Sequence, residues 1–393
     1  MKVLHTSDFH IGKKLEGRDR LDEQKAVLDE IALICKEKDV DVVVISGDVY
    51  DTYTPSAEAE DLFYDSLINI SNQKAQIIIC AGNHDDYKRL CAASELASRN
   101  GIYIFGTNRD KHRIKESQAK CKAISSGEGY IVMQKGEEKV FFGVVGYPSE
   151  NRYKEKIDEN EGYSERVARW ISEVMDKNTE GLPSVLVSHL FILGGQKTES
   201  ERDIELGGTR VISPELLPDC NYVALGHLHK NQRVSKSKNA YYSGSIFQCA
   251  FDEEKDEKSV NLVEIKNGES SVVERIYLTK YKRLKRLTVE GFENVENSLL
   301  PYKDTYVELT LKSDKPLLYS ESKTLSSFGE IAKLILQIKP SDLKQNDTYL
   351  KREMSHLDLF KRYYKEKQNC EPDDEMVNLY ATFMQEIIEN ETK

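Results

Sequence analysis

The sequence predicts an α/β fold, because short apolar runs rich in β-branched residues alternate with segments of helical periodicity. Gly or polar residues bound these runs, as is typical of buried strands. The five clearest runs occupy residues 3–4, 42–45, 77–79, 185–187 and 222–225. A candidate functional motif begins within a few residues of the end of each run. Such alternation favours helices that cover a sheet, with functional side chains in the loops beyond the strand ends.

Two helices are expected between the first three strands. Leu21, Leu28, Ile31 and Cys35 recur at helical spacing and predict a helix between the first and second strands. A second helix is expected over 57–67, with a proline near its first turn, where proline is favoured. The order strand, helix, strand, helix, strand follows from these two segments.

A change of pattern comes near residue 280. A basic run at 280–286 stands out in a chain whose net charge is -11. It is expected to be a solvated linker or a contact for nucleic acid. Alternating apolar residues at 287–289 and 307–311 then predict two strands.

The last hundred residues predict a small accessory domain followed by a helical tail. Ser327 and Glu330 have the spacing of a capping box, which predicts a helix start before the apolar residues at 331–335. Two short amphipathic helices are expected in the tail, and their apolar faces need either the body of the protein or a partner. The expected division is 1–279, 280–340 and 341–393.

The composition is that of a soluble protein, with 31% charged and 39% hydrophobic residues. The net charge of -11 argues against a protein that coats nucleic acid through bulk positive charge. It does not exclude nucleic acid as a substrate. The seven cysteines are scattered without a Cys-x-x-Cys pair, which predicts reduced thiols in a cytoplasmic protein. Neither a signal peptide nor a membrane span is expected.

Five short motifs carry the candidate ligand chemistry, and they contain five of the eight histidines. Because each follows an apolar run, the five segments can converge on one edge of the fold. In chain order they are Asp8-Phe9-His10, Gly47-Asp48, Gly82-Asn83-His84-Asp85, Ser188-His189 and Gly226-His227-Leu228-His229.

These motifs supply the mixed ligands that two adjacent metal ions require. The candidate ligands are Asp8, His10, Asp48, Asn83, His189, His227 and His229. The Asp48 carboxylate can bridge two ions, and ions ~3.5–4 Å apart can clamp the attacking and leaving oxygens of a phosphoester. The imidazoles favour manganese, iron or zinc over magnesium, and the absence of thiolate ligands argues against a structural zinc site.

His84 and Asp85 are the candidate catalytic residues of the third motif. His84 follows Asn83 immediately, so its side chain is expected to point towards the substrate rather than to a metal. A protonated imidazole there could donate to the leaving oxygen or stabilise the charge on the phosphate. Asp85 is expected either to orient His84 or to anchor the loop.

Structural interpretations compete with each of these functional ones. A single Asp-x-His or Gly-Asp occurs often by chance, whereas five motifs in fixed order after apolar runs do not. Asp51 is expected to stabilise the turn at 47–51. Outside the motifs, His5, His112 and His356 are expected to be structural or solvent-facing.

The motifs resemble the calcineurin-like metallophosphoesterase superfamily, and most closely its SbcD nucleases. The resemblance extends from residue 1 into the last helix. The segments that carry it are HTSDFHIG at 5–12, GDVYDT at 47–52, GNHD at 82–85, ALGHLH at 224–229 and YSGS at 242–245. It implies a sandwich of two sheets flanked by helices, with a small α+β cap domain over DNA and C-terminal helices.

The resemblance also implies a division of labour within the site. One ion, expected to be manganese, would be held by Asp8, His10, Asp48 and His229. The second would be held by Asp48, Asn83, His189 and His227. His84 would be the catalytic histidine.

The activity implied is that of a hydrolase in DNA repair, replication and recombination. Nucleases of this family degrade duplex ends as 3′-to-5′ exonucleases and cut single strands and hairpins as endonucleases. Their partner is SbcC, a coiled-coil ATPase, and this chain has no Gly-x4-Gly-Lys-Ser/Thr loop of its own. The family also implies a homodimer through helices near 55–70 and 88–99, with the last helices seated on SbcC.

Two other functions fit the same motifs. A related phosphoesterase acting on phosphoproteins or small nucleotides would have a similar site, although such phosphatases usually carry Gly-Asn-His-Glu and lack the region 280–393. A DNA-end tether with a decayed site is the non-enzymatic alternative. It would be expected to have lost a ligand, and no ligand residue is missing.

Overall fold

The computed structural model describes residues 1–338, apart from 73, 116, 154, 156–160, 202–209 and 268–270, together with isolated residues between 357 and 380. The tail helices expected within 341–393 lie outside the described residues apart from these isolated positions, as does His356. Among the residues that are described, no helix is long and apolar enough to cross a membrane.

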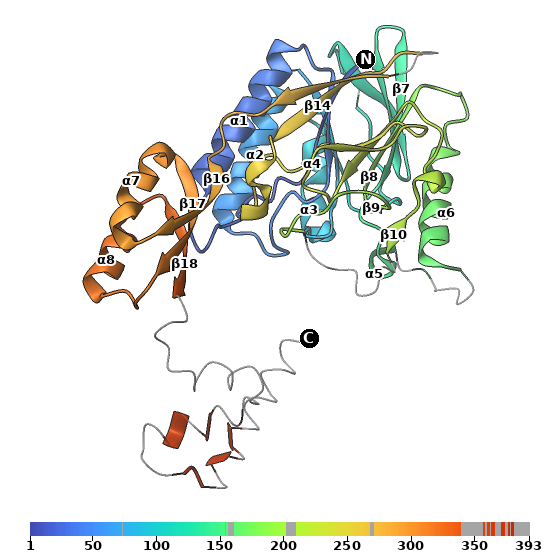
Figure 1. The fold of residues 1–393 in the computed structure, drawn as a ribbon. Coiled ribbons are helices and arrows are strands. Elements are labelled where there is room, and N and C mark those ends of the chain that lie inside the picture. Colours follow the sequence, from blue (N-terminus) through green and yellow to red (C-terminus); the bar gives the residue numbers. More distant parts are fainter. Residues whose placement is uncertain are drawn as a thin grey trace.

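Two mixed sheets form the centre of the molecule (Figure 1). The six-stranded sheet has the order β15 (Val272–Tyr277), β14 (Ser259–Glu264), β1 (Lys2–Thr6), β2 (Val42–Ser46), β3 (Gln76–Cys80) and β4 (Ile102–Phe105). The seven-stranded sheet has the order β12 (Gln232–Ser235), β13 (Ala240–Tyr242), β11 (Tyr222–Gly226), β8 (Ser184–His189), β7 (Glu138–Val145), β6 (Tyr130–Lys135) and β5 (Cys121–Gly127). All five apolar runs of the sequence are strands of these sheets.

The two sheets pack face to face over an apolar core. Val44 and Ile78 of the first sheet meet Phe142 and Val187 of the second in one buried cluster. β1, β2 and β3 run parallel to one another, as do β8 and β11. Every residue of β2, β8 and β11 is buried, because both faces of these strands are covered.

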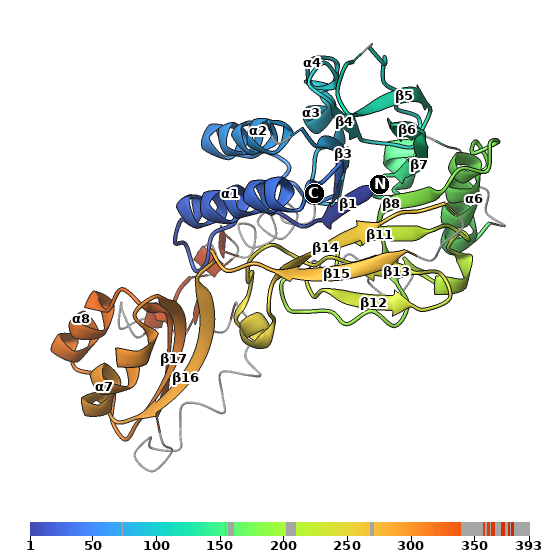
Figure 2. The same cartoon turned by 90° about the horizontal axis from the view of Figure 1, so that it is seen from above.

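Helices cover the outer faces of both sheets (Figure 2). Helices α1 (Leu21–Glu37) and α2 (Ala57–Ser71) pack against the first sheet, and α6 (Tyr163–Met175) packs against the second. Ser56 caps α2, accepting a hydrogen bond from the Ala59 amide, so Pro55 precedes the cap. The shorter elements are α3 (Tyr87–Cys91), α4 (Ser94–Ser98), α5 (Glu150–Tyr153), β9 (Phe191–Ile192), β10 (Val211–Ile212) and the 3-10 helices η1 (Pro214–Leu216) and η2 (Phe251–Lys255).

A separate three-stranded parallel sheet follows β15. Its order is β16 (Arg283–Glu290), β17 (Thr305–Ser313) and β18 (Ile331–Ile338). Helices α7 (Val295–Leu299) and α8 (Tyr319–Ser327) connect the strands, with short 3-10 helices η3 (Phe292–Asn294) and η4 (Leu300–Tyr302) beside α7. Figure 1 shows this unit, drawn in orange, to one side of the larger one.

The predicted helix that begins at Ser327 is wrong. Ser327 ends α8, and the apolar residues after it belong to β18. Ile331, Leu334 and Ile335 have the i, i+3, i+4 spacing of a helix, but pairing with β17 overrides it. Leu334 lies opposite Leu309 in that register, with its own side chain exposed.

The basic run at 280–286 meets acidic groups of the same chain. Lys285 pairs with Glu254 at 3.5 Å, and Arg286 pairs with Glu308 at 2.9 Å and Glu199 at 3.0 Å. The pairs with Glu254 and Glu199 join the small unit to the large one, and the pair with Glu308 lies within the small unit. They favour a packed connection over a free basic patch.

Candidate metal centre

The five motifs lie at the ends of β1, β2, β3, β8 and β11. Because these strands are parallel neighbours within their sheets, and β2 packs against β8 and β11 across the core, their carboxyl ends meet at one place. Backbone hydrogen bonds tie the loops together. The Asp8 amide donates to the Gly47 carbonyl, and the His10 amide donates to the Asp48 carbonyl, each at 3.0 Å.

Four of the motif residues adopt a left-handed backbone that side chains rarely take. The φ angles are +51° at Asp8, +43° at His10, +50° at Asp48 and +108° at His227. Such conformations are costly and tend to cluster at functional sites. Here they turn each side chain into the space where the loops meet.

Close approach explains two of the glycines in the motifs. A Cβ at Gly82 would collide with the Asp48 carboxylate, and a Cβ at Gly226 would collide with the Ser46 carbonyl. The glycines therefore let the loops of different strands touch.

The first cluster consists of Asp8, His10 and His229, next to Asp48. The Nε2 atoms of His10 and His229 lie 3.0 Å apart, and His10 Nε2 lies 3.7 Å from Asp48 Oδ2. The side-chain ligand atoms of Asp8, His10 and His229 all lie within 4.8 Å of one another. That spacing suits one shared ion.

The second cluster consists of Asn83, His189 and His227, again next to Asp48. Asn83 Oδ1 lies 2.8 Å from His189 Nε2 and 3.0 Å from His227 Nδ1. His189 Nε2 lies 3.4 Å from Asp48 Oδ2, the oxygen that also faces the first cluster. Asp48 therefore stands between the clusters, as a bridging carboxylate must.

The donor atoms of both clusters fit a pair of divalent ions. In the first, two imidazole nitrogens face each other at 3.0 Å, the separation expected of two ligands at about a right angle on one ion with bonds of about 2.1 Å. His10 Nδ1 and Asn83 Nδ2 are buried and have no hydrogen-bond partner among the described residues. The mixed nitrogen and oxygen ligands suit a transition-metal ion.

The electrostatics of the centre favour cations. Burial alone would raise the pKa of Asp48, but the neighbouring His189, His84 and His10 hold it well below its usual range. Burial lowers the pKa of His10 to about 3 and the pKa of His227 well below its usual value. Both imidazoles are therefore neutral, which is the form that binds a metal ion.

His84 lies at the first cluster but is held differently from the ligands. Its ring stands edge-on to the ring of His10, with 4.7 Å between the centres, and His10, Asp48 and His84 are close enough to hold an ion. However, His84 Nδ1 lies 2.7 Å from the Asp51 carbonyl oxygen, which can only accept. Nδ1 therefore carries a proton, and Nε2 is the nitrogen left for substrate.

Asp85 anchors the loop that carries Asn83 and His84. Its carboxylate accepts hydrogen bonds from the amides of Val49, Tyr50 and Gly82 at 3.2, 3.0 and 2.8 Å. Of the two roles predicted for Asp85, these contacts favour anchoring of the loop over orientation of His84.

Arg152 holds the same loop from α5. Its guanidinium donates to the carbonyls of Gly82 and Asp85, each at 2.8 Å, and packs over the rings of Tyr87 and Tyr147. The sequence motifs did not indicate Arg152, because it joins the site only when α5 folds against it.

Other residues outside the motifs contact the Nδ1 atoms of His229 and His10, on the ring side away from the cluster. His229 Nδ1 lies 2.5 Å from Ser200 Oγ and 3.5 Å from Glu253, which pairs with Lys258. His10 Nδ1 lies 3.3 Å from Asp51 without hydrogen-bond alignment, and Lys13 pairs with Asp51. Asp51 thus also touches the site, beyond its predicted role in the turn.

The predicted structural histidines have protein partners that account for them. His5 is buried between the Tyr222 hydroxyl at 2.9 Å and the Leu225 carbonyl at 3.1 Å. His112 packs against Tyr103 and Phe105. Neither belongs to the metal centre.

Comparison with known proteins gives matches of two kinds. The calcineurin-like phosphoesterase family matches residues 1–231. A protein of Bacillus subtilis (strain 168), named as the SbcD subunit of the nuclease SbcCD, is 33% identical over 413 residues, with 100% of both chains covered. A protein of the same name from Staphylococcus saprophyticus is 30% identical over 318 residues, covering 79% of this chain and 78% of that one.

Solved structures give a more remote likeness. A dimetal phosphatase from Danio rerio is 13% identical with a TM-score of 0.40, covering 70% of this chain and 96% of that one. A Thermus thermophilus protein is 12% identical with a TM-score of 0.38, covering 70% of this chain and 98% of that one.

Proposed function

The chain belongs to the calcineurin-like phosphoesterase family and to its SbcD nucleases, and from this premise we propose that it is a metal-dependent DNA nuclease. The observation that carries the proposal is the pair of ligand clusters that share Asp48, with His84 beside them. Hydrolysis of phosphodiesters is the reaction that such a centre serves.

The first cluster with Asp48 would hold one divalent ion, and the second cluster with Asp48 would hold the other. We propose Mn²⁺ for both, because imidazole nitrogens make up about half of the ligands and thiolates are absent from them. When bound, the ions neutralise the phosphate and activate the attacking water.

His84 is proposed as the catalytic histidine. The Asp51 carbonyl fixes its ring through Nδ1, so Nε2 can hold a proton for the leaving oxygen or donate a hydrogen bond to the phosphate. The His84 amide donates to Asp48 Oδ1 at 2.8 Å, which fixes both residues relative to each other. Asp85 and Arg152 keep this loop in place.

The proposed substrates are DNA ends and hairpins, cut by 3′-to-5′ exonuclease and single-strand endonuclease activity during repair and recombination. The test uses linear duplex, single-stranded circle and hairpin DNA with Mn²⁺, beside p-nitrophenyl phosphate. Cleavage of DNA that EDTA abolishes and Mn²⁺ restores is expected. Turnover of the small phosphate without cleavage of any DNA would favour the phosphatase alternative instead.

An SbcC-type ATPase is the proposed partner, because the two named relatives are subunits of an SbcCD nuclease. The tail at 341–393 is its proposed seat. Removal of these residues is expected to leave Mn²⁺-dependent cleavage intact and to abolish co-purification with the ATPase. Retained co-purification would contradict the assignment of the tail.

A homodimer is proposed through α2 and α4. Both helices expose large apolar side chains: Ile68 is 52% exposed and Leu96 is 65% exposed. Such residues favour a protein interface. Light scattering is expected to give a dimer for the native chain and a monomer after I68D and L96D together, and an unchanged mass would contradict this surface.

A further inference from the structure

A buried ion pair lies directly behind His229. Lys258 Nζ contacts Glu253 Oε2 at 2.6 Å, and the side chains of the two residues are 2% and 0% exposed. Burying two charges costs free energy, and a hydrophobic pair of the same volume is often as stable. The stability of the fold alone therefore does not explain why this pair is here.

Hydrogen bonds to protein groups surround both members of the pair, and those of Lys258 use all of its donors. The ammonium of Lys258 donates to Glu253, to the His229 carbonyl at 2.9 Å and to Ser245 Oγ at 2.9 Å. These are its three donors. Glu253 also accepts from the Cys249 amide at 3.1 Å.

The pair reaches the imidazole of His229 through Ser200. Ser200 Oγ donates to Glu253 Oε1 at 2.5 Å and lies 2.5 Å from His229 Nδ1. Because the serine proton points to the carboxylate, the serine oxygen accepts from Nδ1–H of His229. Nε2 is then the nitrogen left for the ion, and it faces His10 in the first cluster.

We propose that Glu253 and Lys258 are positioning residues that fix the tautomer and orientation of His229 and so set the affinity of the first cluster for its ion. The inference rests on the proposed function. A carboxylate behind a ligating histidine increases the basicity of the ligand and fixes its ring, and its loss typically costs about 10–100-fold in metal affinity. Lys258 also fixes the backbone of the same histidine, because its ammonium donates a hydrogen bond to the His229 carbonyl.

This arrangement does not make a third metal site. His229, Cys249 and Glu253 are close enough to hold an ion. However, the ammonium of Lys258 already supplies the cation that Glu253 requires. Lys258 thus balances the charge of Glu253, and Glu253 remains available to the hydrogen bonds that hold His229.

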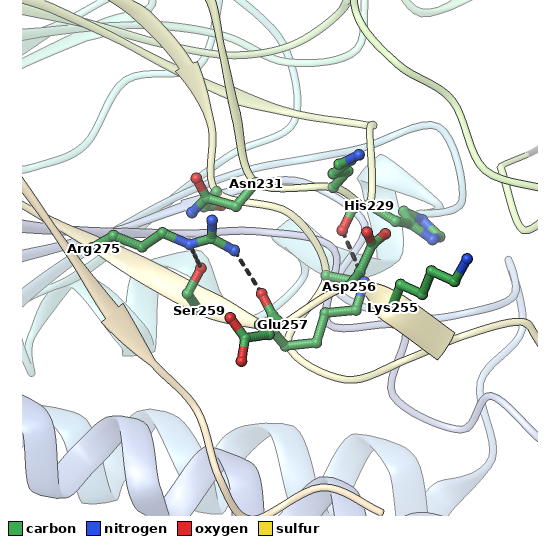
Figure 3. A pocket seen from close by; sticks show the side chains of 11 residues that line it. His229, Asn231, Lys255, Asp256, Glu257, Ser259 and Arg275 are labelled. Carbon is green, nitrogen blue, oxygen red and sulfur yellow. Dashed lines mark hydrogen bonds between the residues drawn. The ribbon is translucent and has the colours of Figure 1, made fainter. Parts of the chain in front are cut away.

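A polar pocket of about 260 Å³ lies next to His229 and Lys258 (Figure 3). His229, Lys258 and Ser245 line it together with Arg275, which donates to Ser259 at 2.7 Å. The Lys258 side chain therefore adjoins space large enough for water.

The neighbouring Glu254 provides a matched control. It stands on the same 3-10 helix, but its carboxylate accepts from the Arg286 amide at 2.8 Å and pairs with Lys285. E254Q therefore changes the same charge on the same turn, while the contacts behind His229 remain.

The test measures Mn²⁺ binding to the EDTA-treated full-length chain by calorimetry and by electron paramagnetic resonance of free Mn²⁺. The double variant E253Q/K258M removes both charges, so no unpaired buried charge remains. We expect its first-cluster affinity to fall by about 10–100-fold, with the second-cluster affinity unchanged. E254Q should match the native chain, and H229A identifies the binding step that belongs to the first cluster.

Wild-type affinity at both steps in the folded double variant would overturn the inference. S200A gives an independent arm, since it removes only the bridging hydroxyl and no charge. It should weaken the same step by about 10-fold, and an unchanged affinity would count against the inference even if the double variant failed to fold. A native chain that binds fewer than two ions would instead contradict the proposed function.

Discussion

The two clusters of the metal centre share Asp48 but differ in what stands behind their histidines. In the first cluster, carboxylates paired with lysines back the imidazoles: Asp51 behind His10, and Glu253 behind His229. In the second cluster, His189 Nδ1 lies 2.9 Å from the neutral carbonyl of Ser46, and no carboxylate pairs with it among the described residues. The difference is one of charge in the surroundings of otherwise similar ligands.

This difference predicts unequal affinities for the two ions. The first cluster includes the carboxylate of Asp8, which also lies within reach of His189, whereas the second cluster includes the neutral amide of Asn83. Negative charge at and behind the ligands strengthens cation binding. We therefore expect the first cluster to retain its ion when the second has released its own.

The largest effect is expected for H84L, which asks whether His84 belongs to the first cluster. Because the Asp51 carbonyl engages its Nδ1, His84 is expected to act on the substrate rather than to bind metal. Cleavage should fall by about 10²–10⁴-fold, as for loss of a general acid or base, while two Mn²⁺ ions still bind. If H84L bound one Mn²⁺ ion fewer in the titration, His84 would be a ligand of the first cluster, which would contradict its proposed catalytic role.

A smaller effect is expected for D51N. The variant keeps the size of the side chain and the backbone carbonyl that holds His84, but it removes the charge behind His10. Mn²⁺ affinity should fall by about 10-fold at the tighter step only. K13M, which leaves the Asp51 carboxylate in place, is the control and should change that step less; equal weakening of both steps would remove the contrast between the clusters.

The smallest effect is expected for R152K, which acts on the second cluster. Lysine keeps the charge but loses the planar fork that donates to the Gly82 and Asp85 carbonyls. The loop that carries Asn83 should loosen, and the weaker Mn²⁺ step should weaken further, by less than about 10-fold. If the tighter step weakened instead, Arg152 would belong to the support of the first cluster.

The convergence of the motif side chains could be predicted from the sequence because each motif directly follows a strand. Parallel strands end at a common edge, so the position of Asp48 or His227 in the chain already indicates where its side chain lies. The α/β sandwich and the family were predicted from the same motifs and are confirmed by the family match and by the full-length relatives. The assignment of each ligand to one of two ions stays a prediction.

The surroundings of the ligands could not be predicted in this way. Glu253 is one residue of an acidic run, and nothing in the sequence distinguishes it from Glu254, which faces the small unit instead. Ser200 and Lys258 meet His229 only through tertiary packing. The segment 331–335 fails for a related reason, since pairing with β17 decides its structure and not its own periodicity.

The central claim is a centre of two ions that share Asp48, with His84 free. Anomalous diffraction at the manganese edge from crystals soaked in Mn²⁺ tests it most directly. Two peaks are expected, one in contact with Asp8, His10 and His229 and the other with Asn83, His189 and His227, with Asp48 touching both. A single peak, or a peak bound to His84, would contradict the account.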